Sequence, residues 1–190
     1  MSADVRHKVR DAAVALFAYK GVKATTIRDI ARAAGVSEGA LYRHWPSKEV
    51  LAAELFATEY TTLSQALRDA AGSGPAPERL RRIIAHAFRL VEAAPESARF
   101  LLLSQHDGLP LVPAGQETPV DVICAVVTDG IAEGSIVHAD CEALAHVVIG
   151  AIMLTVQSHV YGRQTAPLTT LTDTIADAVL NGIATTGAVK

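Results

Sequence analysis

Apolar residues recur every three or four positions along most of this 190-residue chain. That spacing places them on one side of a helix, so it predicts amphipathic helices rather than strands. The sequence shows no strand-like alternation of any length and no internal repeat. The predicted helices cover residues 4–20, two short segments within 25–48, 47–70, 78–93, 95–106, 118–134, about 140–162 and about 170–187. The pattern predicts an all-α fold of about nine helices.

The two short helices within residues 25–48 form the most informative motif, TTIRDIARAAGVSEGALYRHWPSK. Thr26 and Ser37 are predicted to cap the two helices, and Gly35 supplies the permissive turn between them. Apolar residues of both helices would bury themselves around Leu41. The outer side of the second helix carries small residues followed by hydrogen-bonding and cationic ones. This is a helix-turn-helix whose second helix fits the major groove of DNA.

Charge is unevenly distributed along the chain, whose net charge is −3. Residues 1–50 carry nine Lys or Arg against five Asp or Glu, whereas the remainder carries eight against fifteen. The basic end is expected to face DNA, and the acidic remainder would be repelled by phosphate. Half of the residues are hydrophobic but only 5% are aromatic, so the expected core is large and aliphatic.

The two cysteines, Cys124 and Cys141, do not suggest a disulfide framework, and the charged first ten residues do not resemble a signal peptide. We therefore expect a cytoplasmic protein. Ala143–Gly162 contains no Asp, Glu, Lys or Arg and is long enough to span a bilayer. It also contains several polar residues, so we interpret it as a helix buried on two faces and expect no membrane partner.

The segment TTIRDIARAAGVSEGALYRHWPSKEVL closely resembles the DNA-binding region of the tetracycline-repressor (TetR) family. The resemblance covers about the first quarter of the chain; beyond it, only helix number and length are similar. It implies an all-helical homodimeric transcription factor, usually a repressor, whose C-terminal domain binds a small effector. We expect a DNA-binding domain at residues 1–48, a long linking helix at 47–70, and an effector-binding and dimerisation domain at 71–190.

The predicted DNA contacts divide into two groups. Expected phosphate contacts are Thr26, Arg28, Tyr42, His44 and Lys48, of which Tyr42, His44 and Lys48 are implied by the resemblance. Expected near the base edges are Ser37, Gly39, Ala40 and Arg43. Arg43 is the candidate for reading guanine, because its guanidinium matches the two acceptors on that base. The expected operator is a palindrome with half-sites about one helical turn or a little more apart.

The dimer interface and the effector pocket are predicted less directly. The resemblance implies that the last two long helices pair with their copies, and the expected contacts are His146, Gly150, Met153, Gln157, Leu171, Ile175 and Val179. Burial of both faces within one subunit is the alternative. Candidate effector contacts are polar residues in apolar surroundings: Arg99, Gln105, His106, Cys124, Thr155 and His159. Residues of this kind are more often satisfied core or interface groups than ligand contacts. An acyl or other apolar ligand would fit the aliphatic lining.

Catalytic and metal sites find little support in the sequence. It contains no G-x-S-x-G, H-E-x-x-H, P-loop or G-x-G-x-x-G motif, so we expect neither an enzyme nor a cofactor. The H-x-x-C spacing of His138 and Cys141 is interpreted as chance rather than as a metal site. Basic residues along 78–93 are interpreted as a solvated face, with a nucleic-acid surface as the alternative. An activator, a non-inducible DNA-binding protein or a helical ligand carrier stay open as alternative functions.

Overall fold

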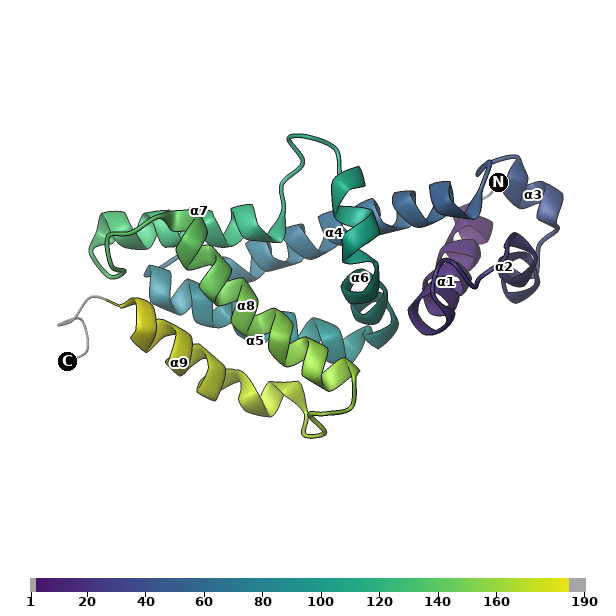
Figure 1. Ribbon diagram of the computed structural model, residues 1–190. Helices are drawn as coiled ribbons and strands as arrows, with labels where there is room; N and C mark the ends of the chain where they lie inside the picture. The colour runs from purple at the N-terminus through teal and green to yellow at the C-terminus, as the bar shows by residue number, and fades with distance from the viewer. Residues whose placement is uncertain (1–2, 185–190) are drawn as a thin grey trace. The chain divides into compact units, whose positions relative to one another are not determined.

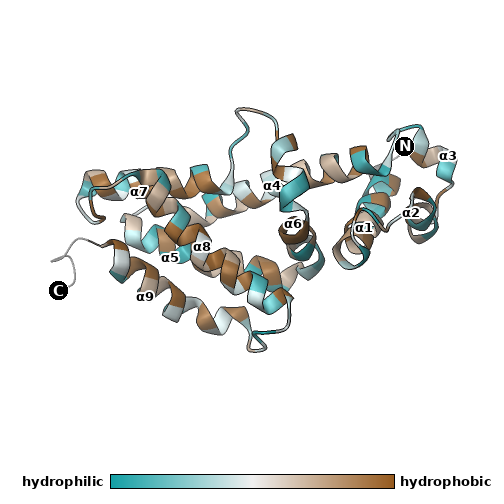
Figure 2. Cartoon of the chain, in the orientation of Figure 1, coloured by the Kyte–Doolittle hydropathy of each residue, from teal (hydrophilic) through white to brown (hydrophobic). Residues whose placement is uncertain are grey.

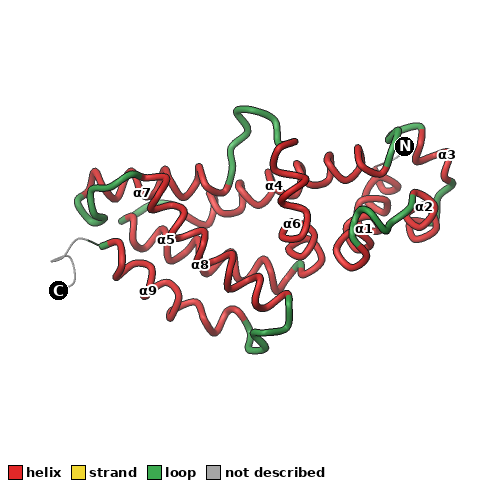
Figure 3. The backbone as a smooth tube through the Cα atoms, in the orientation of Figure 1, coloured by secondary structure: helices red, strands yellow, loops and turns green. Residues whose placement is uncertain are grey.

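The computed structural model describes residues 3–184, which form nine α-helices and two short 3-10 helices without a β-strand (Figures 1 and 3). An isolated antiparallel bridge joins Ile136 to Ala184. The predicted all-α fold is confirmed. The elements are α1 (Ala3–Lys20), α2 (Ile27–Ala34), α3 (Glu38–Tyr42), α4 (Lys48–Ala71), α5 (Ala76–Ala93), α6 (Pro95–Gly108), η1 (Leu109–Leu111), α7 (Pro119–Glu133), α8 (Cys141–Val160), η2 (Leu168–Leu171) and α9 (Thr172–Ile183).

The chain divides into two compact units that alternate along the sequence. Unit 1 contains residues 1–60 and 94–116, and unit 2 contains residues 61–93 and 117–190. Helix α4 is continuous and contributes residues to both units. Helix α6 therefore belongs with the helix-turn-helix, although the expected division at residue 71 had grouped it with the C-terminal part.

Unit 1 is built around three aromatic rings from three different helices. Phe17 of α1 and Phe100 of α6 stack with ring centroids 5.8 Å apart, and Phe56 of α4 meets Phe100 edge-on at 6.3 Å. All three side chains are almost fully buried. Arg99 Nε also donates to the Ala18 carbonyl at 2.8 Å, where it satisfies an oxygen near the end of α1. These contacts hold α6 against α1.

Unit 2 packs α7, α8 and α9 around α5, whose Leu80, Ile83, Ile84 and Phe88 are completely buried. The core is aliphatic apart from that one phenylalanine, as the composition predicted. Helix α8 is largely brown in Figure 2, yet only four of its residues are buried: Ala145, Val148, Ile152 and Val156. Burial of both faces of α8 within one subunit, the alternative to a dimer interface, is therefore not found.

Arginines of α5 connect it to the other elements of unit 2. Arg79 contacts Asp129 of α7 at 2.6 Å, and Arg81 pairs with Asp173 and Asp177 of α9. The Arg82 guanidinium donates to the carbonyl oxygens of Ala70, Ala71 and Ser73 at the end of α4. The predicted basic stripe is thus a set of structural contacts at Arg79 and Arg82 rather than a freely solvated face.

One expectation for the last third of the chain, that the final helix begins near Thr170 with that residue as its cap, is corrected. Thr170 was expected to cap the final helix, but its hydroxyl donates to the Pro167 carbonyl at 2.6 Å within η2, and α9 begins at Thr172 without a side-chain cap. The turn preceding α9 uses the hydroxyl that would have capped it. Helix α9 ends at Ile183, and the expected stop at Gly187 lies outside the described residues.

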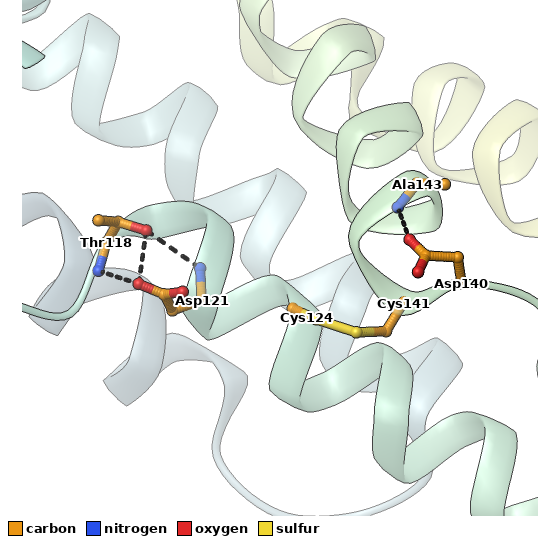
Figure 4. Close-up of a disulfide and its surroundings, with 6 residues drawn as sticks. All are labelled: Thr118, Asp121, Cys124, Asp140, Cys141 and Ala143. Carbon is orange, nitrogen blue, oxygen red and sulfur yellow. Dashed lines mark hydrogen bonds between the residues drawn. A yellow bond between two sulfur atoms is a disulfide. The ribbon is translucent and has the colours of Figure 1, made fainter. Parts of the chain in front are cut away.

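Cys124 and Cys141 form a disulfide, although the sequence did not suggest a disulfide framework (Figure 4). Cys124 lies in the second turn of α7, and Cys141 is the first residue of α8. Their Cα atoms are 5.4 Å apart. The sequence could not show this proximity, because it arises from the packing of α7 against α8 and not from the 17-residue separation.

Candidate nucleic-acid interface

The helix-turn-helix is held in place by local caps that the sequence predicted. The Thr26 hydroxyl accepts from the Asp29 amide at 3.1 Å, and Asp29 accepts from the Thr26 amide, so α2 begins with a capping box. Gly35 ends α2 in the left-handed conformation at φ 68°. The Ser37 hydroxyl accepts from the Ala40 amide and begins α3. The predicted caps at Thr26 and Ser37 are confirmed.

Asp29 is also fixed electrostatically. The Lys20 ammonium donates to its carboxylate at 2.7 Å, and this contact, followed by the bonds to Thr26, holds the pKa of Asp29 well below its usual value. The carboxylate therefore stays ionised and keeps capping α2 at any pH near neutrality. The start of α2 is accordingly a fixed reference point for the residues around it.

Helix α3 buries one side and presents the other to solvent. Leu41 is completely buried, and Trp45 just beyond the helix is 3% exposed, with its Nε1 donating to Glu54 at 2.8 Å. Exposed on the outer side are Ser37, Gly39, Tyr42, Arg43 and His44, with Ala40 half-buried among them. The residues expected to approach DNA thus share one open surface, called the recognition face below.

Arg43 differs from Arg28, Arg32 and Lys48 of the same motif, which pair with other groups of the protein. Among the residues that the structure describes, its guanidinium has no hydrogen bond or ion pair, whereas Arg28 lies 3.4 Å from Glu38. Arg43 follows the last residue of α3 and accordingly stands at the end of the recognition face. An unpaired guanidinium at such a position can turn towards a base edge without breaking a contact in the protein.

A shallow hollow of about 290 Å³ lies beside the recognition face, between the beginnings of α2 and α4. Its lining includes Thr26, Tyr42, Ser47 and Lys48. The Ser47 hydroxyl accepts from the Val50 amide at 3.2 Å and thereby caps α4. Two helix N-termini therefore flank one hollow, an arrangement that favours a phosphate. Ser47 was absent from the predicted contacts, although its position before a helix was recognisable from the sequence.

Lys48 has a structural contact that the sequence did not reveal. Its Nζ donates to the carbonyl oxygens of Lys23 and Thr25, both at 2.8 Å, and so braces the turn between α1 and α2. An ammonium group has three donors, and the Glu49 carboxylate lies 3.9 Å from Nζ, beyond hydrogen-bond distance, so the third donor is left for a phosphate. Lys48 can therefore hold the hollow in shape and contact an anion in it.

The predicted effector contacts fall into two sets that belong to different units. Arg99, Gln105 and His106 lie on α6 in unit 1, where Arg99 already binds the Ala18 carbonyl. Cys124, Thr155 and His159 lie in unit 2; Cys124 is in the disulfide, and the Thr155 hydroxyl donates to Ala151. His159 Nδ1 is buried without a hydrogen-bond partner among the described residues. Within the described residues, it is the member of the set with a buried polar atom left to bind a ligand.

The predicted dimer contacts also divide by exposure. His146, Gly150 and Met153 are exposed on α8, and they continue into Val147 and Leu154, which are 51% and 65% exposed. Gln157, Leu171 and Ile175 are half-buried. Val179, in contrast, is only 6% exposed and packs in the core of unit 2. The exposed residues of α8 are called the α8 face below.

By length and composition, α8 is the one helix among the described residues that could cross a membrane, with a mean hydropathy of 1.6. The same property is found in core helices of soluble proteins. Residues 141–160 pack on α5, α7 and α9 through the side opposite the α8 face. No group of three or more metal-binding side chains occurs within residues 3–184.

Comparison with known proteins finds a family match for the first quarter of the chain. Residues 9–55 match the family described as bacterial regulatory proteins, tetR family. The HTH-type transcriptional repressor KstR2 of Mycobacterium tuberculosis is 39% identical over 88 residues, which are 46% of this chain and 44% of that protein. The match thus spans less than half of that relative. The fatty acid metabolism regulator protein of Bacillus subtilis is 25% identical over 182 residues, 93% of this chain and 94% of that protein.

Solved structures share the fold of the whole chain. FadR from Bacillus subtilis, in complex with stearoyl-CoA, is 22% identical with a TM-score of 0.82 and covers 94% of this chain and 99% of its own. FadR from Bacillus halodurans, a fatty acid degradation regulator, is 20% identical with a TM-score of 0.85, covering 96% and 97%. The fold of this chain therefore occurs in solved structures of transcriptional regulators.

Proposed function

Because residues 9–55 match the tetR family of bacterial regulatory proteins, we propose that this chain is a transcriptional repressor that binds a palindromic operator as a homodimer. A small-molecule effector would release it from DNA. The observation that carries this proposal is the recognition face, where five exposed residues lie on or directly beside one capped, firmly packed helix. The repressor role is supported by the name of the KstR2 relative. We further propose that the protein is cytoplasmic, uses no cofactor and catalyses no reaction.

Phosphate and base contacts have separate places in this proposal. Thr26, Tyr42, Ser47 and Lys48 would hold a backbone phosphate in the hollow between α2 and α4. Further phosphate contacts would come from Arg28, once it leaves Glu38, and from His44. Arg43 would read a guanine, with Ser37, Gly39 and Ala40 closest to the other base edges. The small side chains let the backbone of α3 approach the groove floor.

The α8 face supports a homodimer as the operator-binding form. Its apolar side chains are exposed in one subunit, and an aliphatic stripe of this kind is normally covered by a partner. A twofold axis would present two recognition faces to two half-sites about one DNA turn apart, at about 34–36 Å. The same pairing would cover the α8 face without any need for a membrane.

The proposed effector is a molecule with a long or bulky apolar body. The aliphatic core of unit 2 supports it, and so do the relatives: one FadR structure contains stearoyl-CoA, and KstR2 is named a ketosteroid regulator. His159 would supply a polar contact, because its buried Nδ1 has no partner among the described residues. Binding would favour a protein state whose two recognition faces no longer match the operator spacing.

Operator titrations test the proposal directly. Fluorescently labelled DNA from upstream of the protein's own gene is titrated with wild type, Arg43→Ala and Arg89→Ala. Arg89 is the matched control, because it is an exposed arginine in unit 2 with no hydrogen bond or ion pair among the described residues. We expect Arg43→Ala to weaken specific binding about 5- to 150-fold, equivalent to about 1–3 kcal/mol, and to relax preference at one base pair.

The result has two parts that can fail separately. Binding of the wild type should fall steeply with salt, because contacts to phosphate release counterions. Arg89→Ala should bind like wild type. Equal losses of operator affinity in the two arginine variants would mean that Arg43 contributes only through its positive charge. If the wild type protects no palindromic site in footprints of that DNA or neighbouring promoters, the repressor proposal is wrong.

A further inference from the structure

The only two cysteines of the chain lie where the beginnings of α7 and α8 come together. We propose that Cys124 and Cys141 are a reversible thiol–disulfide pair, an oxidation-sensitive clamp that ties α7 to α8. Both side chains are half-buried, so a small oxidant or reductant can reach them while the surrounding core stays closed. Neither residue takes part in the recognition face or the α8 face.

Hydrogen bonds at the two helix starts, none of which involves a cysteine side chain, fix the backbone that carries the two sulfurs. Thr118 and Asp121 cap each other at the beginning of α7, with bonds of 2.8 Å and 3.2 Å (Figure 4). Asp140 accepts from the Ala143 amide at 2.8 Å and fixes the first turn of α8 (Figure 4). The Cα separation of 5.4 Å lies within the range of roughly 4.4–6.8 Å that disulfides require. Closure therefore needs no movement of either helix.

Bond formation requires an oxidant, and a hydroperoxide meets the chemistry. One thiolate sulfur attacks the outer peroxide oxygen, the O–O bond breaks, and the alcohol or water leaves with a proton, which produces a sulfenic acid. The second thiolate attacks that sulfur, the S–O bond breaks, and hydroxide leaves as water after protonation. Two electrons pass from the two sulfurs to the peroxide. A dithiol reductant reverses the process through a mixed disulfide.

Reversibility follows from where the protein is proposed to work. Disulfides in cytoplasmic proteins are usually transient and sense redox state rather than acting as permanent staples. This step rests on the proposed cytoplasmic regulator, whereas the pairing itself rests only on the packing of α7 and α8. Closing the pair restricts the unfolded chain between residues 124 and 141, so the oxidised protein should be the more stable form.

The test uses the full-length protein with hydrogen peroxide or diamide as oxidant and dithiothreitol as reductant. Thiols titrated in denaturant should fall from two to none per chain on oxidation and return to two on reduction. Mass spectrometry should find a Cys124–Cys141 linked peptide in a chain of monomeric mass. Thermal unfolding should shift upward by roughly 5–10 °C on oxidation, the shift expected for a loop of this length.

Serine variants provide the controls. Cys124→Ser/Cys141→Ser should unfold at one temperature under both conditions, and its unoxidised stability should match that of the reduced wild type. The proposal is overturned if both thiols persist after oxidation, if the linked species is a covalent dimer, or if lost thiols do not return on reduction. Because these readouts do not involve DNA, they can succeed or fail independently of operator binding.

Discussion

At the scale of single residues, Gly130 is the glycine of unit 2 that leaves the least space for an added side chain among the described residues. A Cβ added there would lie 2.5 Å from Ile136 Cδ1 and 2.8 Å from the Ala76 Cβ. Gly130→Ala should therefore lower the free energy of unfolding by about 1–3 kcal/mol, the usual effect of overpacking. Gly182 is a helical glycine with open space around an added Cβ, so Gly182→Ala should raise the free energy of unfolding by about 0.5–1 kcal/mol. Chemical denaturation measures both, and equal effects would contradict the packing argument.

His86 makes stability depend on pH. Burial, and then the nearby Arg89, lower the pKa of His86, with Asp69 opposing. A histidine with a lowered pKa binds protons more readily in the unfolded chain, so its contribution to stability is complete above about pH 6.5. That contribution is lost as the pH falls through the folded-state pKa. We expect His86→Gln to show a shallower fall in unfolding free energy between about pH 7 and 5 than wild type.

The control for His86 is His138→Gln, an exposed histidine in the loop before α8. Urea titrations at several pH values measure the slope for each protein. If His86→Gln and wild type have the same slope, burial of His86 does not govern the pH dependence of stability.

The sequence predicted single residues well where their partners are local. Thr26, Ser37 and Asp140 cap helices three residues away, so a short window contains both partners. Contacts between distant segments were not visible in any window. Lys48 bracing the Thr25 carbonyl is one such contact, because its geometry depends on how the helices pack. The recognition face could be predicted for the same reason as the caps, since it lies within one short motif.

At the scale of elements, α6 shows how position in the chain can mislead. It follows α5 after a single residue, yet Phe100 packs with Phe17 in the core of unit 1. The apolar run of α6 indicated burial, but periodicity does not identify which core receives a helix. The expected grouping with the C-terminal helices reflected sequence order alone.

Phe100→Ala tests the place of α6 in unit 1. Removing a fully buried ring should cost about 3–5 kcal/mol, whereas Leu103→Ala on the same helix, where the side chain is 43% exposed, should cost less than about 1 kcal/mol. Because Phe17 belongs to the helix-turn-helix unit, Phe100→Ala should also weaken operator binding at temperatures where the wild type stays folded. Thermal unfolding and operator titration measure the two effects. An unchanged operator affinity at 37 °C would argue that α6 does not support the recognition face.

At the scale of the whole molecule, the proposed dimer depends on the α8 face. Gly150 lies within that face, and nothing lies within 4 Å of a Cβ added there in one subunit. Gly150→Trp should therefore leave the subunit folded but convert the dimer to monomers at micromolar concentration. Ala132→Trp, at an exposed helical position of α7, is the matched control and should stay dimeric.

Light scattering with in-line chromatography measures the masses. A monomeric wild type would contradict the proposed assembly, and a dimeric Gly150→Trp protein would place the interface elsewhere. Sequence alone identified α8 as a dimer candidate, since an uncharged helix needs apolar partners. It did not show which side is already covered within the subunit, because both sides are apolar in composition.

The alternation of the two units along the chain limits how such a protein can be recombined. Residues 94–116 return to the unit that contains the helix-turn-helix, so a single crossover at residue 71 would join a DNA-reading head to a foreign α6. The stacking of Phe100 on Phe17 and the hydrogen bond from Arg99 to the Ala18 carbonyl would then depend on the foreign sequence. A chimaera that exchanges DNA specificity between relatives should therefore transfer residues 1–60 and residues 94–116 together.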